Sequence, residues 1–174
     1  MGVALRIAST WDGEPARPNE VVELMLARRP DGLALEVEAP WFGDPPPSAP
    51  PGPTDRLWEL EVVELFLAGP GEPHEIPYLE VELGPHGHFL VLRFRGVRRL
   101  VGSEPGLDFT VRRDARRWTG RAHLPEAWLP PRPWRANAFA LHGVGAARRY
   151  LAASPLTGSA PDFHQPGSFP PLDL

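Results

Sequence analysis

The feature that most constrains this chain is a single carboxylate inside an apolar run. Residues 62–67 read VVELFL, so Glu64 is surrounded by five apolar side chains. Successive residues of a β-strand face opposite sides of a sheet. The odd-numbered residues of the run therefore face one side, and Glu64 faces the other side with Val62 and Phe66.

Both faces of this predicted strand are apolar, which is typical of a central strand covered on both sides. Burying an ionised carboxylate is costly unless the group is paired or hydrogen-bonded. Glu64 therefore needs a partner. The sequence leaves open whether that partner is structural or a ligand.

Short strand-like runs recur about every ten residues and are separated by Gly and Pro. This spacing predicts an all-β fold, an antiparallel sandwich or barrel. A sustained helical period is absent, and residues 125–128 could form one helical turn that begins with proline. The expected strands span 3–9, 21–28, 33–39, 62–68, 78–83, 88–95, 107–113, 118–124, 136–143 and 149–153.

Turn residues predict two hairpins. Gly84–Gly87 joins the runs 78–83 and 88–95, and Asp114-Ala115 lies at the tip of another hairpin. The proline-rich segment 44–53 is expected to be a stiff loop with polyproline II geometry. The residues before it are too few for a stable sheet domain of their own, so we expect one domain over 1–174.

Composition narrows the function classes. The 174 residues contain no cysteine and no lysine, which excludes thiol chemistry, Schiff-base lysines and P-loops. A net charge of −4 argues against nucleic-acid binding. No run approaches the ~18 apolar residues of a membrane span, and the N-terminus lacks a signal-peptide pattern, so a cytoplasmic location is expected. All 18 basic residues are arginine, which fits a thermophile or GC-rich codon usage.

The run 78–83 contains further acidic residues, which also need a partner if they are buried near Glu64. A symmetric turn at Gly84–Gly87 would place Glu80 opposite Val91 and diagonal to Arg93, and this predicts a cross-strand ion pair. Pairing of 62–68 with 78–83 would bring Glu64 near Glu82 or Glu80. Close carboxylates need an arginine, a shared proton or a cation such as Ca²⁺.

Several readings of these acids stay open at this stage. An ion pair of Glu64 with Arg93 or Arg95 is the structural alternative. A catalytic carboxylate pair is another, although nothing in the sequence places a substrate between the two groups. Recognised nucleophile, metalloprotease and phosphate-loop motifs are absent.

The six tryptophans suggest where a ligand could lie. Trp41 and Trp58 flank the proline-rich segment, and an aromatic beside a stiff loop is a suitable wall for a sugar or another flat ligand. Packing in the core is the alternative role for each tryptophan.

An ordered set of four segments carries a resemblance to a known family. With this set the chain resembles the DOMON-like superfamily, in particular its branch similar to family 9 carbohydrate-binding modules, over about residues 33–172. Small stand-alone bacterial members look most alike. The segments are Leu57–Leu67, Tyr78–Gly87, Trp134–Phe139 and the C-terminal stretch Tyr150–Thr157 with Pro161–Phe169.

The resemblance implies a β-sandwich with jelly-roll-like or immunoglobulin-like topology and a ligand against one sheet. Members bind saccharide ends between aromatics, often with structural calcium, and DOMON cytochromes bind haem through Met and His. Asn137, Asp162 and His164 match family motif positions. The structural alternative for 162–164 is a C-terminal latch with Phe163 buried.

The sequence therefore predicts a binding domain for a small molecule, with a carbohydrate as the expected ligand and no catalytic role. The alternatives are a haem- or redox-related DOMON module and an intracellular interaction domain without a small ligand. Glu64 and Glu80 would hold calcium if that ion binds. The expected ligand-binding residues are Trp41, Trp58, Glu64, Glu80, Asn137, Asp162 and His164.

Overall fold

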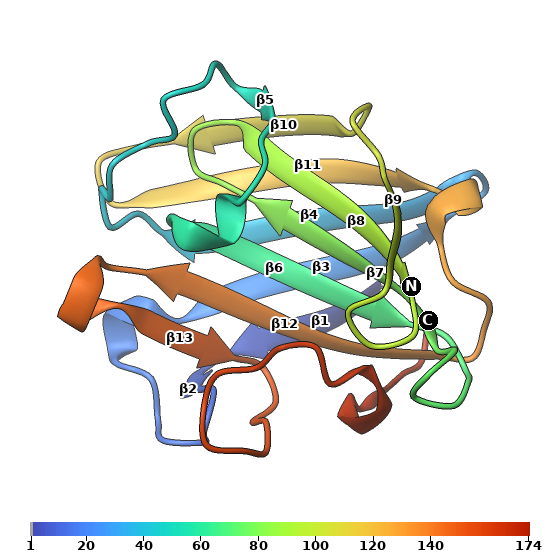
Figure 1. The fold of residues 1–174 in the computed structure, drawn as a ribbon. Coiled ribbons are helices and arrows are strands. Elements are labelled where there is room, and N and C mark those ends of the chain that lie inside the picture. Colours follow the sequence, from blue (N-terminus) through green and yellow to red (C-terminus); the bar gives the residue numbers. More distant parts are fainter. Residues whose placement is uncertain (1) are drawn as a thin grey trace.

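The computed structural model describes residues 2–174, which form two β-sheets lying face to face (Figure 1). One sheet has five strands, all antiparallel. Its order is β1 (Gly2–Ile7), β3 (Val22–Arg29), β4 (Gly32–Pro40), β11 (Arg117–Pro125) and β10 (Asp108–Arg113).

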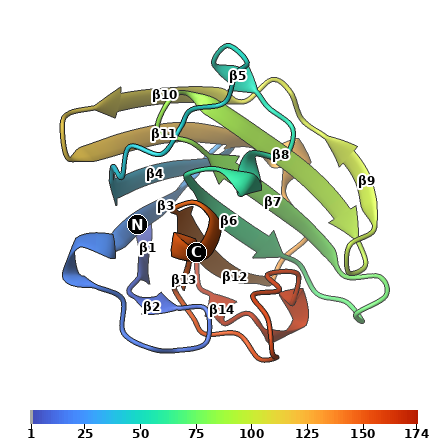
Figure 2. The same ribbon diagram turned by 60° about the vertical axis from the view of Figure 1, so that its left-hand side comes forward.

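The other sheet has nine strands and curves around the first (Figure 2). Its pairings are antiparallel except for the short parallel contact between β5 and β8. Two short strands lie off the main path, where β14 pairs with β12 and β9 pairs with β8. The strands are β2 (Ser9–Thr10), β13 (Arg149–Ala152), β12 (Trp134–His142), β6 (Val62–Ala68), β7 (Pro77–Leu83), β8 (His88–Arg95), β5 (Gly52–Pro53), β9 (Leu100–Ser103) and β14 (Pro171–Leu172).

The main core lies between the two sheets. The odd-numbered residues of β6 and of β7 face inward and pack against the leucines of β3 and β4 and against Trp118 of β11. This is the alternation that the VVELFL run predicts. The expected all-β sandwich is confirmed.

A second apolar cluster covers the outer face of the nine-stranded sheet. Phe66 of β6, Tyr78 of β7 and Phe139 of β12 pack there against Phe163 and Phe169. The last two belong to the C-terminal segment that follows β13, whose red loops lie beside β12 in Figure 2. Both faces of β6 are therefore buried, as its sequence requires.

Within residues 2–174 helical structure is confined to short 3₁₀ turns. One of them confirms the turn expected after Pro125. The turns are η1 (Pro18–Glu20), η2 (Leu57–Glu59), η3 (Glu126–Trp128), η4 (Gly145–Ala147) and η5 (Pro166–Ser168). None of the helices in residues 2–174 has the length and apolar character that crossing a bilayer would take.

The expected register of the β7–β8 hairpin is wrong by one residue. Glu80 lies opposite Leu92 rather than Val91, and Arg93 lies opposite Leu79. The physical reason is the turn: Gly84 N–H donates to the His88 carbonyl, so the loop between them has three residues. Gly87 supplies the left-handed residue of this loop, with φ +86°.

The one-residue shift separates Glu80 from its expected partner, because it moves Arg93 to the opposite face of the sheet. Arg93 instead forms an ion pair with Glu104, with 2.7 Å between Nε and Oε1. Within residues 2–174 Glu64 makes no ion pair with Arg93 or Arg95.

A buried carboxylate of a different kind ties η1 to the nine-stranded sheet. Arg149 of β13 donates two hydrogen bonds of 2.8 Å to Glu20. The Arg17 backbone N–H donates a third of 2.9 Å, and His142 Nε2 lies 3.1 Å from the same carboxylate. Burial raises the pKa of Glu20, but the bonds from Arg149 and Arg17 outweigh it and lower the pKa to about 2.

We expect Gly87→Ala to destabilise the fold by about 1 kcal/mol or more, because alanine is strained at this left-handed φ. Its Cβ would also lie 3.3 Å from Pro51. Gly167→Ala is the control, since a Cβ there meets open space. Urea unfolding measures both, and equal stabilities would contradict the assigned role of the turn.

Glu20 gives a second prediction, on acid stability. A carboxylate whose folded-state pKa lies near 2, against 4.5 for the ordinary group, stabilises the fold above pH 4.5 and loses this contribution as the pH falls toward 2. Glu20→Gln should therefore lower the urea midpoint at pH 6 and approach the parent protein near pH 2. A variant as stable as the parent at pH 6 would refute the assigned role of Glu20.

Candidate functional site

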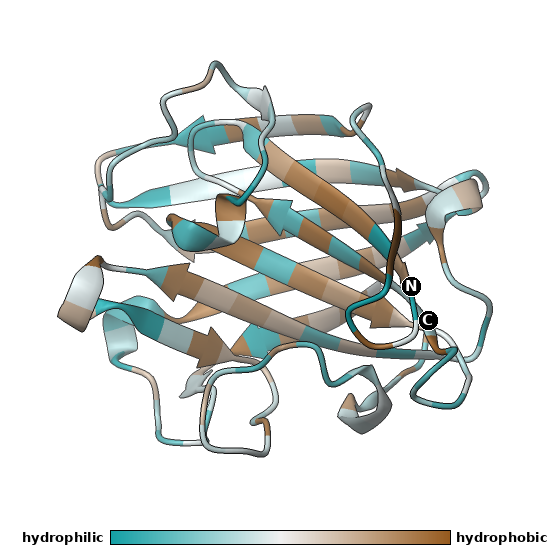
Figure 3. Ribbon diagram, in the orientation of Figure 1, coloured by the Kyte–Doolittle hydropathy of each residue, from teal (hydrophilic) through white to brown (hydrophobic). Residues whose placement is uncertain are grey.

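A hollow of about 760 Å³ lies on the outer face of the nine-stranded sheet. Its floor comes from β6, β7 and β8, and its walls come from η2, from the β8–β9 turn and from the segments around β13. Hydrophilic segments interrupt the apolar strands of this sheet (Figure 3). The side chains that line the hollow and carry the discussion below are Trp58, Glu64, Glu80, Phe94, Arg98, Arg148, Tyr150, Phe163 and His164.

Three carboxyl groups are buried together under this face. Glu64 of β6 lies directly opposite Glu82 of β7, and Glu80 follows two residues away on the same face. Directly opposed residues have their Cβ atoms about 4.5–5.5 Å apart. The exposed fractions are 1% for Glu64, 4% for Glu80 and 0% for Glu82.

These carboxyl groups have few partners within the protein. One oxygen of Glu64, one of Glu80 and both of Glu82 are buried and accept no hydrogen bond. Burial, followed by repulsion from Glu80, raises the pKa of Glu64 well above its usual range. Burial raises the pKa of Glu80 to about 7, and burial with the facing Glu64 raises that of Glu82. The structure thus favours the protonated, uncharged form of these acids.

A hydrogen-bonded chain positions His164 at the edge of the floor. The Arg98 backbone N–H donates to the Tyr78 hydroxyl at 2.9 Å, and that hydroxyl lies 2.8 Å from His164 Nδ1. Burial and the nearby Arg98 lower the pKa of His164 to about 4, so the ring is neutral. Tyr78 then donates to Nδ1, and Nε2 carries the proton, 3.8 Å from a Glu80 oxygen.

Arg148 holds two walls of the hollow together. It follows η4, and its guanidinium donates to the Gly143 carbonyl, to the carbonyl of Trp58 within η2 and to that of Leu60 directly after η2. The same guanidinium lies 5.9 Å from the centre of the Tyr150 ring. Trp58 is 39% exposed beside it, so an aromatic surface is open to the hollow.

The structure brings four of the expected ligand-binding residues to one place, namely Trp58, Glu64, Glu80 and His164. Asp162 lies behind them. Its Oδ1 accepts the His164 backbone N–H at 3.1 Å and pairs with Arg98 at 2.7 Å, which fits the latch interpretation.

Trp41 and Asn137 lie elsewhere. Trp41 packs under the Arg113 guanidinium at 4.2 Å, near the β7–β8 turn. The side-chain amide of Asn137 bonds to the backbone: Nδ2 donates to the Ser154 carbonyl, and Oδ1 accepts the N–H of Ser154 and of Ala138. Asn137 thus fixes the turn after β13.

The sequence predicted Glu82 near Glu64 but not among the ligand-binding residues, and it did not identify Arg98, Arg148, Phe94 and Tyr150 as parts of this region. Strand alternation places Glu82 on the same face as Glu80, and that signal was available. The others depend on long-range packing. Arg98 lies in a tight turn with φ +59°, and Arg148 acts on carbonyls about 90 residues away.

No group of three or more His, Asp or Glu side chains within residues 2–174 is arranged to hold a metal ion. The Met and His pair of a DOMON-type haem site is also not formed by Met25. Met25 lies on the outer face of the five-stranded sheet, whereas His164 lies over the nine-stranded sheet. Met1 lies outside the described residues.

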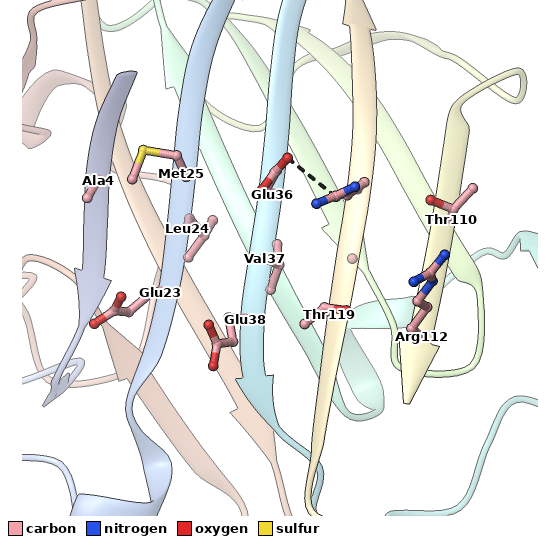
Figure 4. Close-up of a pocket in the computed structure, with 12 residues that line it drawn as sticks. Ala4, Glu23, Leu24, Met25, Glu36, Val37, Glu38, Thr110, Arg112 and Thr119 are labelled. Carbon is pink, nitrogen blue, oxygen red and sulfur yellow. Dashed lines mark ion pairs between the residues drawn. The ribbon is translucent and has the colours of Figure 1, made fainter. Parts of the chain in front are cut away.

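A second, smaller hollow of about 450 Å³ lies on the outer face of the five-stranded sheet (Figure 4). Its acids already have partners, since Glu36 pairs with Arg121 at 3.3 Å and Glu38 pairs with Arg117 at 3.0 Å. This exposed network of ion pairs is typical of a solvated sheet face. The nine-stranded sheet therefore carries the candidate site.

We expect Glu82→Gln to stabilise the protein at high pH. An acid with a raised folded-state pKa destabilises the fold as the pH rises above 4.5, because the unfolded chain loses its proton first. The gain should be near zero at pH 4 and about 1 kcal/mol or more at pH 8. Exposed Glu75→Gln is the control, and urea unfolding at both pH values is the measurement. A Glu82→Gln variant that is less stable than the parent protein at pH 8 would show that Glu82 has a stabilising partner in the fold.

No family model matches the chain. The UPF0462 protein C4orf33 homolog of Mus musculus is 40% identical over 97% of this chain and 90% of its own length. The UPF0462 protein C4orf33 of Homo sapiens is 40% identical over 91% of this chain and 82% of its own length. A crystal structure of a proposed carbohydrate-binding protein from Bacteroides uniformis shares the fold, with a TM-score of 0.75 and 16% identity over 97% of this chain and 84% of that one. By its close similarity to these mouse and human proteins, the chain belongs to the UPF0462 family.

Proposed function

We propose that this protein is a non-catalytic binding domain for a small hydroxyl-rich ligand of the saccharide class, held in the hollow over the nine-stranded sheet. One observation carries the proposal: Glu64 and Glu80, each with a buried oxygen that accepts no hydrogen bond, line the same hollow as the exposed Trp58 side chain. Buried polar groups in proteins are normally satisfied. A ligand rich in donors would satisfy these.

The size and walls of the hollow support this proposal. Its volume of about 760 Å³ falls within the range of roughly 300–1,000 Å³ found for small-molecule sites. Trp58 and Tyr150 offer flat apolar surface on the walls, and Phe94 and Phe163 lie near the floor. A sugar ring presents apolar C–H groups on its faces and hydroxyls around its edge, which suits this combination.

The arrangement of the acids supports binding rather than hydrolysis. A glycosidase carries its two carboxyl groups on opposite sides of the scissile bond. Glu64, Glu80 and Glu82 instead lie side by side on one face of one sheet. They can donate or accept hydrogen bonds from below a ligand, but they do not flank it.

The shared fold adds support of a weaker kind. The protein from Bacteroides uniformis with this fold is itself a proposed carbohydrate binder. The DOMON-like resemblance with its branch of carbohydrate-binding modules points to the same ligand class.

A saccharide panel tests the proposal. At least one mono- or oligosaccharide should quench the tryptophan fluorescence and give a dissociation constant in the micromolar to millimolar range. Trp58→Ala should weaken that binding about 10-fold or more in calorimetry, because it removes the exposed wall. Trp41→Phe is the matched control and should bind as the parent does.

Two outcomes would end the proposal. One is the absence of binding by any saccharide of the panel at millimolar concentration. The other is a Trp58→Ala variant that binds as tightly as the parent protein.

A further inference from the structure

We propose that the ligand of this hollow carries a protonated primary amine, as an amino sugar does, and that Glu64 and Glu80 receive the ammonium group. This inference rests on the proposed function and specifies the ligand's charge. Glu82 lies directly behind as a third acid of the same cluster.

The two receiving side chains meet the geometric requirement. Both are more than nine-tenths buried, both line the hollow, and each has an oxygen without a hydrogen-bond donor. They project from neighbouring strands on one face, in diagonal positions, so an ammonium above them can reach both. Two of its three N–H donors would have one unused oxygen of Glu64 and one of Glu80 as acceptors.

The fold supplies no cation in direct contact with these two acids. The chain has no lysine, and Arg98 is paired with Asp162. Arg148 directs its donors to three backbone carbonyls. Both guanidiniums line the hollow, and Arg148 lowers the pKa of Glu64 and Arg98 that of Glu80, but in both acids burial outweighs this effect. His164 is held neutral. A directly bonded countercharge for an ionised floor would therefore come from the ligand.

An ammonium group is a better match than a hydroxyl for this reason. A neutral hydroxyl can bond to a protonated acid but cannot offset the cost of ionising it in a buried site. A cation can, and charge-assisted hydrogen bonds are the stronger kind. Burial raises the pKa of Tyr78 to about 12, so its hydroxyl stays neutral in this pH range and adds no competing charge.

Proton balance follows from this arrangement. When the ammonium binds above a protonated glutamic acid, that acid releases one proton to the buffer and the resulting carboxylate pairs with the cation. The burial-raised pKa of Glu80, about 7, makes this release measurable near neutral pH. Affinity for the amine should rise as the pH increases from 5 to 7, because protons compete with the ligand for the floor.

The experiment compares matched sugars by calorimetry at pH 6.5. Glucosamine, galactosamine and mannosamine are each measured against the parent hexose and the N-acetyl derivative, which keeps the nitrogen but removes its charge. At least one amino sugar should bind about 10-fold or more tightly than both counterparts. Its binding enthalpy should vary with the ionisation enthalpy of the buffer and indicate release of about one proton.

Variants separate the inference from the proposed function. Glu64→Gln should abolish the preference for the amine while neutral sugars still bind, and Glu75→Gln should change nothing. Equal affinity for amino, hydroxyl and N-acetyl forms would overturn the inference and leave saccharide binding intact. Binding of none of the nine sugars would overturn the inference, and the wider panel above then decides the proposed function separately.

Discussion

The burial of three carboxyl groups on one sheet face is the constraint on which the rest of this structure depends. Glu64, Glu80 and Glu82 occupy adjacent positions on β6 and β7, where water is excluded by aromatic packing. One oxygen of Glu64, one of Glu80 and both of Glu82 accept no hydrogen bond. An unsatisfied group in the interior costs about 1–3 kcal/mol, so a face with several of them is maintained at the expense of stability. Ligand binding explains such a face more directly than folding does.

Comparison with Glu20 makes the argument sharper. Glu20 is as buried as the three acids of the hollow, yet Arg149 and a backbone N–H satisfy it and lower its pKa to about 2. The same residue type therefore has opposite electrostatic behaviour at two places in one fold. At Glu20 the protein provides the partner. In the hollow it does not, and the proposed ligand would take that place.

Much of the fold and part of the site could be predicted from sequence. Strand alternation in the VVELFL run identified a central strand covered on both faces and assigned Glu64 to the outer face. The same alternation brought Glu64 close to Glu80 and Glu82. Local patterns suffice here because the period of a strand fixes the direction of its side chains.

Other features depended on information that local patterns lack. The β7–β8 register depends on whether the loop of the Gly84–Gly87 turn has an even or an odd number of residues. A difference of one residue places Arg93 on the opposite face from Glu80. Two other features depend on the path of long loops. They are the hydrogen bonds of Arg148 to η2 and the position of Trp41 away from the hollow. Such contacts are determined by the whole fold, so the pattern of a single sequence does not reveal them.

The hollow is assembled from the middle and the last part of the chain. Its floor is complete by Arg95, at the end of β8, but Arg148, Tyr150 and His164 of its walls come from the last part of the chain. During synthesis on the ribosome, the acids of β6 and β7 therefore emerge before the segment that covers them. The hollow takes its final form only when that segment docks on the outer face.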